Sequence, residues 1–166
     1  MRKIILIGFA TSGKSSVGKL LAERIGAEFV DTDVEIERQC GMSVGEIFDQ
    51  RGEAYFRQRE NEILSSFIDR QNVVVACGGG SVLSESFTRL ADHSFVVLLT
   101  ATVETVHARL GDTPRPLFDG RGITELQRLI AERAPLYRRY ADVTFPTDNL
   151  TPSQLAELIL KSHHLV

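Results

Sequence analysis

The chain has 166 residues, 43% of them hydrophobic and 25% charged, which is ordinary for one soluble domain with a sizeable core. Its formal net charge of -3 excludes a generally basic surface for nucleic acid or anionic membranes. No apolar run approaches the roughly 20 residues of a membrane span, and the apolar start is too short for a signal peptide. The two cysteines, Cys40 and Cys77, lack metal-like spacing and indicate a reducing compartment, so we expect a cytoplasmic protein.

Five apolar runs predict strands, and helical patterns lie between them. The runs are rich in Val, Ile, Leu and Phe and mostly do not alternate with polar residues, as in strands covered on both faces of a parallel sheet. The predicted strands are 3–9, 27–33, 72–77, 94–100 and 141–147. The predicted helices are 14–26, a short and a long one within 43–70, then 84–91, 102–110, 123–140 and 151–164. This alternation predicts an α/β fold with a parallel sheet and helices on both sides, as one domain over 1–166.

Two local features refine this layout. The last helix is expected to begin with Thr151 as its N-cap and Pro152 at its first helical position. The stretch "GDTPRPLFDGRG" at 111–122 is rich in Gly, Pro and Arg, which cannot form a helix interior. We expect a mobile flap or an ordered excursion there.

The segment "GFATSGKS" at 8–15 matches the P-loop pattern G-x-x-x-x-G-K-[ST] and stands between a predicted strand and a predicted helix. In such a loop, backbone N–H groups converge on the β-phosphate of a nucleotide. Lys14 would reach the β and γ oxygens, and the Ser15 hydroxyl would ligate Mg²⁺. The alternative is a purely structural glycine-rich turn. The expected ATP-binding residues of this loop are Ala10, Thr11, Ser12, Gly13, Lys14, Ser15 and Ser16.

A P-loop indicates a nucleoside triphosphate but leaves three classes of protein open. A GTPase needs N-K-x-D to recognise guanine, and that string is absent from the sequence. A mechanical ATPase needs a long apolar strand that ends in an acid, whereas "SFVVLLT" ends in Thr100. A small-molecule kinase remains, and it requires a second site for an acceptor hydroxyl.

Acidic residues for that site follow the second predicted strand, in "FVDTDVEIE" at 29–37. Ligands of open α/β sheets bind beyond the carboxyl ends of the strands. If this segment is extended, Asp31 and Asp33 project on the same side, one near Mg²⁺ and the other near the incoming hydroxyl. The alternative is that Asp33 only caps a helix.

Three arginines suggest anionic ligands. Arg57 has Glu53 and Glu60 at helical spacing, which is usually solvated surface pairing. Arg115 stands between two prolines in the 111–122 segment, and Arg133 precedes an Ala-Pro pair.

The run "VVVACGGGSV" places three consecutive glycines after a strand: Gly78, Gly79 and Gly80. Since each glycine costs backbone entropy, something is expected to approach this backbone too closely for side chains. A flexible turn is the alternative.

The ordered set "GFATSGKSSVGK", "DTDVEIE", "GMSVGEIFDQRGEAYFR", "CGGGSV", "RPLF" and "ERAPLY" resembles shikimate kinase from the first residues to about residue 147. That family has the three-layer P-loop fold of nucleoside monophosphate kinases, with sheet order 2-3-1-4-5, mobile substrate-binding helices and a lid. The resemblance implies a substrate-binding region at about 33–61 and a lid at about 111–122. It implies phosphorylation of the 3-hydroxyl of shikimate by ATP with Mg²⁺, in aromatic amino acid biosynthesis.

The resemblance also implies the roles of the residues. Asp33 would be the catalytic base, with Lys14 and Arg115 stabilising the transferred group. Arg109 would pack on adenine, although a second adenine-side arginine is not evident near the last strand. The implied shikimate-binding residues are Asp33, Arg57, Gly78, Gly79, Gly80 and Arg133, and Ser15 and Asp31 would hold the metal.

Cys77 is then expected to be the buried end of a strand rather than a nucleophile. We expect a monomer without nucleic-acid or membrane partners. The alternatives are another small-molecule kinase, such as gluconate kinase, and a non-catalytic nucleotide-binding module.

Overall fold

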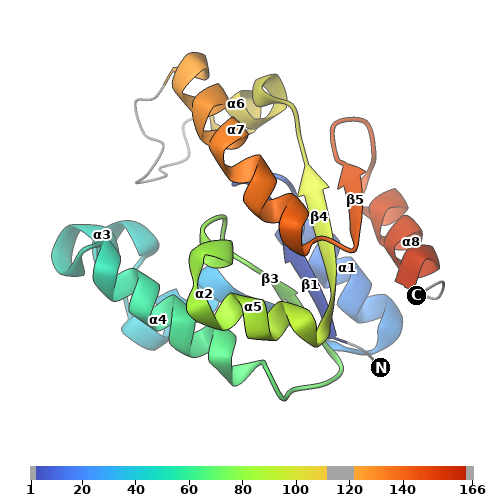
Figure 1. Ribbon diagram of the computed structural model, residues 1–166, viewed down its shortest axis with the longest axis horizontal. Coiled ribbons are helices and arrows are strands. Elements are labelled where there is room, and N and C mark those ends of the chain that lie inside the picture. Colours follow the sequence, from blue (N-terminus) through green and yellow to red (C-terminus); the bar gives the residue numbers. More distant parts are fainter. Residues whose placement is uncertain (1–2, 112–121, 164–166) are drawn as a thin grey trace.

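The central strand of the sheet, β1 (Lys3–Ile7), is buried along its whole length. It pairs in parallel with β3 (Val73–Ala76) on one side and β4 (Ser94–Thr100) on the other. The outer strands are β2 (Glu28–Asp31), beside β3, and β5 (Val143–Pro146), beside β4. The sheet order β2-β3-β1-β4-β5 confirms the predicted topology. This computed structural model describes residues 3–111 and 122–163 (Figure 1).

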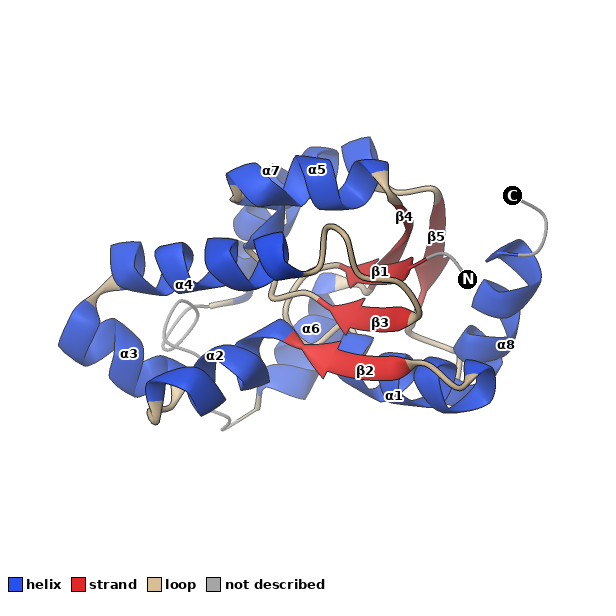
Figure 2. Ribbon diagram, turned by 90° about the horizontal axis from the view of Figure 1, so that it is seen from below, coloured by secondary structure: helices blue, strands red, loops and turns tan. Residues whose placement is uncertain are grey.

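Helices cover both faces of the sheet, and alternate residues of β1 point to opposite faces. Ile4 and Leu6 pack with α1 (Lys14–Ile25) and α8 (Pro152–His163). Ile5 and Ile7 belong to the larger core on the other face. Figure 2 shows α1 and α8 on one side of the sheet and α4, α5 and α7 on the other. The helices of the larger core are α2 (Thr32–Cys40), α3 (Val44–Arg51), α4 (Glu53–Ser66), α5 (Glu85–Asp92), α6 (Val103–Leu110) and α7 (Ile123–Tyr140).

The predicted ends of two helices are confirmed. Gly26 caps α1 at φ 63°, in the left-handed region that favours glycine. Thr151 and Gln154 exchange hydrogen bonds at the start of α8, and Pro152 is its first residue. No helix among the described residues is long and apolar enough to span a bilayer.

Helix α2 was not predicted from the sequence. The predicted strand over 27–33 ends at Asp31, and a helix begins at Thr32. The reason is local: the Asp31 carboxylate accepts hydrogen bonds from the backbone N–H of Asp33 at 3.0 Å and of Val34 at 3.2 Å. A carboxylate that satisfies the first N–H groups of a helix favours helix over strand at that point. Asp33 therefore lies in the first turn of α2, not on an extended segment.

Helices α2, α3 and α4 extend to one side of the sheet, on the left in Figure 1. Their sequence interval contains the predicted acceptor region. The turn between α3 and α4 is Gly52, at φ 86°. A capping box at Ser43 and Glu46 begins α3.

Candidate active site

A cleft of about 1210 Å³ opens at the carboxyl ends of the strands. The P-loop after β1 lines it, as do the β2–α2 junction and the glycine turn after β3. Parallel strands end at one edge of the sheet, so three segments far apart in sequence meet there. The candidate residues that line the cleft are Ala10, Thr11, Ser12, Gly13, Lys14, Ser15, Ser16, Asp31, Asp33, Gly78, Gly79 and Arg109.

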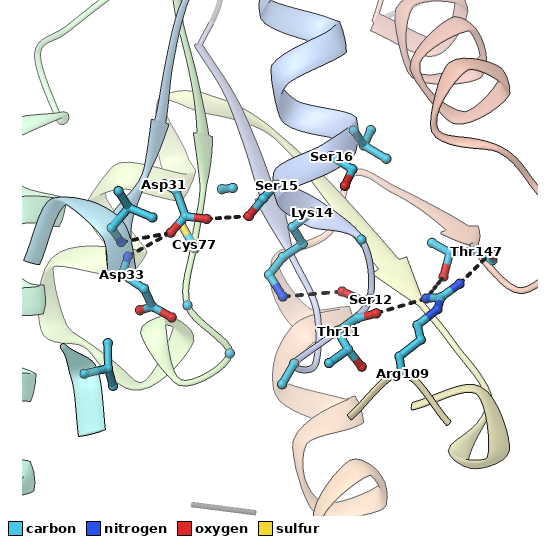
Figure 3. Close-up of a pocket in the computed structure, with 18 of the residues that line it drawn as sticks. Thr11, Ser12, Lys14, Ser15, Ser16, Asp31, Asp33, Cys77, Arg109 and Thr147 are labelled. Carbon is cyan, nitrogen blue, oxygen red and sulfur yellow. Dashed lines mark hydrogen bonds between the residues drawn. The ribbon is translucent and has the colours of Figure 1, made fainter. Parts of the chain in front are cut away.

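The P-loop wraps around the Lys14 side chain. Its ammonium donates to the carbonyls of Gly8 and Phe9 at 2.8 and 2.9 Å and to the Ser12 hydroxyl at 3.3 Å. A side chain at Gly8 is excluded, because its Cβ would lie 2.2 Å from the Leu99 carbonyl oxygen. These three hydrogen bonds hold the Lys14 ammonium near the N-terminus of α1, and a helix N-terminus favours anions. Figure 3 shows the Lys14 side chain pointing into the loop.

The two expected metal ligands lie against each other. The Ser15 hydroxyl donates to Oδ2 of Asp31, while Oδ1 of Asp31 caps α2 (Figure 3). Asp31 therefore is the N-cap, a role that the sequence analysis considered for Asp33. One hydroxyl and one carboxylate oxygen suit Mg²⁺, which keeps several waters and takes few protein ligands beside phosphate oxygens. Among residues 3–111 and 122–163, no group of three His, Cys, Asp or Glu forms a dedicated metal cage.

The surroundings of the glycine turn explain why two of its residues, Gly78 and Gly80, carry no side chain. A Cβ at Gly78 would lie 2.6 Å from Oδ1 of Asp33, and one at Gly80 would lie 2.5 Å from both terminal nitrogens of Arg57. Such distances are far shorter than ordinary contacts, so the absence of side chains at these two glycines makes room for the side chains of Asp33 and Arg57. Gly79 differs, because its Cβ would approach nothing closer than 3.5 Å, the distance to the Ala10 nitrogen. Among the described residues, a methyl group at Gly79 would therefore make only ordinary van der Waals contacts.

Arg57 is not the solvated surface residue that its spacing to glutamates suggested. Its Nη1 donates to Oε1 of Glu60 at 2.8 Å, and Glu60 is completely buried. Oε2 of Glu60 accepts from the Ser81 hydroxyl at 2.8 Å. Glu53 lies farther away, at 3.5 Å, and is exposed. Glu60 therefore ties Arg57 to the residue that follows the glycines.

Sequence reasoning missed Glu60, although a signal was present. It occupies the buried stripe of α4 that Phe56, Ile63 and Leu64 otherwise fill. A carboxylate in an apolar stripe requires a partner when buried, and Arg57 stands one turn before it. Thr32 was also missed: it is fully buried and accepts a hydrogen bond from the Gly78 N–H at 2.9 Å.

Arg133 contacts the same turn from α7. Its Nη1 donates to the Gly79 carbonyl at 2.9 Å, and the hydroxyl of Tyr137, one helical turn later, donates to the same carbonyl at 2.6 Å. Tyr137 was not a candidate in the sequence analysis, although its four-residue spacing from Arg133 placed both on one face. Arg57, Gly80 and Arg133 do not line the cleft. They adjoin it through the glycine turn.

Arg109 lies on the opposite side of the P-loop. It donates to the Thr11 carbonyl at 2.9 Å, the Thr147 hydroxyl at 3.1 Å and the Thr147 carbonyl at 3.3 Å (Figure 3). It thereby connects the P-loop to the segment after β5. Thr147 is buried and lines the cleft, and it was not identified from the sequence.

Cys77 is 1% exposed, at the end of β3. Burial raises the pKa of its thiol, and the Glu60 carboxylate acts in the same direction. The prediction that Cys77 is a buried strand end is confirmed. Arg115 and most of the 111–122 segment lie outside the described residues.

Comparisons with known proteins agree with this geometry. The shikimate kinase family description matches residues 10–164. A shikimate kinase of Francisella tularensis subsp. holarctica is 42% identical over 164 residues, covering 95% of this chain and 92% of that protein. One of Persephonella marina is 40% identical over 162 residues, covering 96% and 98%.

Solved structures give the same result. The shikimate kinase from Acinetobacter baumannii in complex with shikimate has a TM-score of 0.93 at 35% identity, covering 99% of this chain and 94% of that one. A gluconokinase from Sinorhizobium meliloti has a TM-score of 0.61 at 20% identity, over 99% and 93%, which is a likeness of fold alone. Because the family matches nearly its whole length, the chain belongs to the shikimate kinase family.

Proposed function

We propose that this cleft transfers the γ-phosphoryl group of ATP to the 3-hydroxyl of shikimate, giving shikimate 3-phosphate and ADP. Family membership makes the chain an ATP-dependent phosphotransferase of the shikimate pathway. One observation carries the assignment of the site: Lys14 and Ser15 line the same cleft as Asp33 and Gly79. A phosphate-binding loop and a carboxylate that faces it are the two halves that a small-molecule kinase needs.

On the nucleotide side, the backbone N–H groups at the start of α1 and the Lys14 ammonium bind the phosphates. Lys14 now donates to loop carbonyls, so it exchanges those bonds for phosphate oxygens when ATP arrives. Arg109 lies where adenine is expected, between the P-loop and Thr147. Arg115, outside the described residues, remains our candidate for stabilising charge on the transferred group.

Ser15 and Asp31 would hold Mg²⁺ together with phosphate oxygens, and the ion would neutralise charge on the β- and γ-phosphates. Their direct hydrogen bond brings both oxygens to one place before a metal arrives. The Asp31 carboxylate is fixed there because its second oxygen caps α2.

On the acceptor side, Asp33 orients the hydroxyl and accepts its proton. The hydroxyl oxygen forms a bond to the γ-phosphorus while the bond from that phosphorus to the bridging oxygen of ADP breaks. Arg57 and Arg133 bind the shikimate carboxylate, since a planar guanidinium matches a carboxylate bidentately. The backbone of Gly79, which carries no side chain, would lie beside the ring. Catalysis is then mainly positioning and charge neutralisation.

The wider organisation is also part of the proposal. We propose one kinase domain over residues 1–166, with residues 33–61 as the substrate-binding region and 111–122 as the lid. We propose that it acts as a monomer in the cytoplasm, without nucleic-acid or membrane partners. Cys40 and Cys77 are both free thiols, which supports a reducing compartment.

A panel assay tests the function. ADP release would be measured with ATP, Mg²⁺ and one acceptor at a time: shikimate, gluconate or a nucleoside monophosphate. Of these three acceptors, we expect only shikimate to support turnover. Asp33→Asn keeps the shape of the side chain and removes the base, so turnover is expected to fall about 10²–10⁴-fold. Lys14→Met is expected to abolish most transfer while shikimate binding, followed by calorimetry, persists. Turnover with gluconate, or ATP binding without acceptor-dependent ADP release, would overturn the proposal in favour of the corresponding alternative.

A further inference from the structure

Two side chains of α7 hold one backbone carbonyl of the glycine turn. The Tyr137 hydroxyl and Nη1 of Arg133 donate to the Gly79 oxygen at 2.6 and 2.9 Å. Tyr137 is 4% exposed, so its hydroxyl has exchanged water for this carbonyl. A buried tyrosine hydroxyl normally finds such a partner. Here the partner is the carbonyl of Gly79, the middle residue of the glycine turn.

The orientation of that carbonyl determines which groups the turn offers. In a trans peptide, the N–H of Gly80 points opposite to the Gly79 carbonyl, and no described peptide bond is cis. A carbonyl held by α7 therefore directs the Gly80 N–H away from α7. Within the described part of the chain, the N–H groups of Gly79 and Gly80 make no hydrogen bond to another residue. Both remain donors for a ligand.

Consecutive glycines rotate their peptide planes easily, because they lack the steric restriction of a Cβ. An acceptor that binds to such a turn must first fix it, unless the protein has already done so. Arg133 alone is a poor restraint, since we assign the same guanidinium to the acceptor carboxylate. Tyr137 has no such second task. Burial raises the pKa of its phenol, so the hydroxyl remains a donor throughout the neutral range.

We propose that Tyr137 is a positioning residue for the acceptor, which it serves by fixing the Gly79 peptide before shikimate binds. This inference rests on the proposed function, because it assumes that the turn belongs to the acceptor site. It assigns Tyr137 no direct contact with either substrate. Its effect must therefore fall on acceptor affinity rather than on nucleotide affinity.

Tyr137→Phe removes one oxygen and leaves the Gly79 carbonyl with its bond from Arg133, so no buried carbonyl is orphaned. We expect KM for shikimate to rise about three- to tenfold, as for the loss of one neutral hydrogen bond. KM for ATP should stay within twofold. Calorimetry of shikimate with the nucleotide-free protein should show the same loss of affinity.

Tyr140→Phe is the matched control. Tyr140 stands three residues later on α7, and its hydroxyl bonds to the Thr88 hydroxyl at 2.9 Å, away from the glycine turn. Both variants lose one phenolic oxygen from the same helix, and thermal melting would record the stability of each. We expect only Tyr137→Phe to change the KM for shikimate.

An unchanged shikimate KM in Tyr137→Phe, with the wild type active on shikimate, would overturn the inference and leave the proposed function intact. Equal rises in the KM for ATP and for shikimate would also overturn it, because they indicate general disturbance. If the wild-type protein itself fails to phosphorylate shikimate, the proposed function fails instead. The wild-type assay therefore separates the two failures.

Discussion

Asp33 and Gly78 lie so close that a side chain at position 78 is incompatible with the observed place of the carboxylate. A Cβ there would meet Oδ1 of Asp33 at 2.6 Å and Oε2 of Glu60 at 3.3 Å. Two segments that are 45 positions apart in sequence thus share one small volume. The glycine is part of how the proposed base is positioned.

Gly78→Ala is expected to displace Asp33 and to lower kcat at least tenfold, because a misplaced base loses much of the about 10²–10⁴-fold that general-base catalysis contributes. Gly79→Ala is the comparison: its Cβ would have ordinary contacts in the free protein. Thermal melting should show a stable fold for Gly79→Ala, with a raised KM for shikimate if the ring packs there. A fully active Gly78→Ala variant would contradict the positioning of Asp33.

The two carboxylate oxygens of Asp31 have different partners: Oδ1 caps α2, and Oδ2 accepts from Ser15 at the proposed Mg²⁺ site. Substitution separates the cap from the proposed metal role. Asparagine caps helices about as well as aspartate, so Asp31→Asn should keep α2 and the stability of the fold. It removes the charge beside Ser15, so the Mg²⁺ concentration for half-maximal activity should rise several-fold. Asp31→Ala should lose the cap as well, at about 0.5–2 kcal/mol of unfolding free energy. Titration of activity with Mg²⁺ and urea unfolding measure the two effects independently. An unchanged Mg²⁺ requirement in Asp31→Asn would remove Asp31 from the metal site.

The two thiols should differ sharply in reactivity. Burial raises the pKa of Cys77, whereas Cys40 is partly exposed. A thiol reagent at neutral pH should label one cysteine in the native protein and two in denaturant. Rapid labelling of both in the native state would contradict the burial of Cys77, which a reagent could reach from the cleft that it lines.

The same thiol predicts a pH dependence of stability. The thiol of an unfolded cysteine has a pKa of about 8.5. The pKa of Cys77 in the folded state is higher, so its thiol is still protonated at that pH. Above that pH the folded state binds more protons, so the free energy of unfolding falls as pH rises. The stability contributed by Cys77 is complete below the unfolded pKa and is lost as pH rises toward the folded pKa. Cys77→Ala should flatten the urea-unfolding profile between pH 8 and 9.5 relative to wild type.

Much of the fold followed from the sequence because its signals are repetitive. Five apolar runs alternate with helical patterns, which is typical of a parallel sheet with helices on both faces, and the resemblance to shikimate kinase supplied the strand order. Helix α2 was missed because its beginning depends on one oxygen of Asp31, which sequence patterns do not distinguish from a metal ligand. Both roles are compatible with the same residue.

Sequence reasoning proposes site residues where a motif specifies them, and it misses neighbouring residues that only packing brings to the cleft. The P-loop pattern identifies Lys14 and Ser15 by their spacing alone. Glu60 and Tyr137 reach the glycine turn only through the packing of α4 and α7, where they bond to Ser81 and to the Gly79 carbonyl. No local sequence pattern specifies such long-range contacts. Arg57 was therefore identified without Glu60, which accepts from it, and Arg133 without Tyr137, which shares its Gly79 acceptor.

Arg57→Lys tests geometry rather than charge. A lysine keeps the positive charge beside the buried Glu60, so the carboxylate is not left unpaired and the fold should persist. It loses the planar guanidinium that suits a carboxylate. If Arg57 holds the shikimate carboxylate, KM for shikimate should rise roughly tenfold or more, since charge-assisted hydrogen bonds contribute about 1.5–3 kcal/mol. KM for ATP should move little, because the nucleotide binds at the P-loop.

Arg59→Lys is the control on the same helix. Arg59 donates to Glu62 at 2.7 Å, with both side chains partly exposed, in the surface pairing first considered for Arg57. Exposed pairs of this kind contribute about 0.2–1 kcal/mol, and Arg59→Lys should leave both KM values unchanged. Steady-state kinetics with each substrate varied separately compares the two variants. Should Arg57→Lys behave like Arg59→Lys, the buried contact with Glu60 would be purely structural, and Arg133 would be left to bind the carboxylate without it.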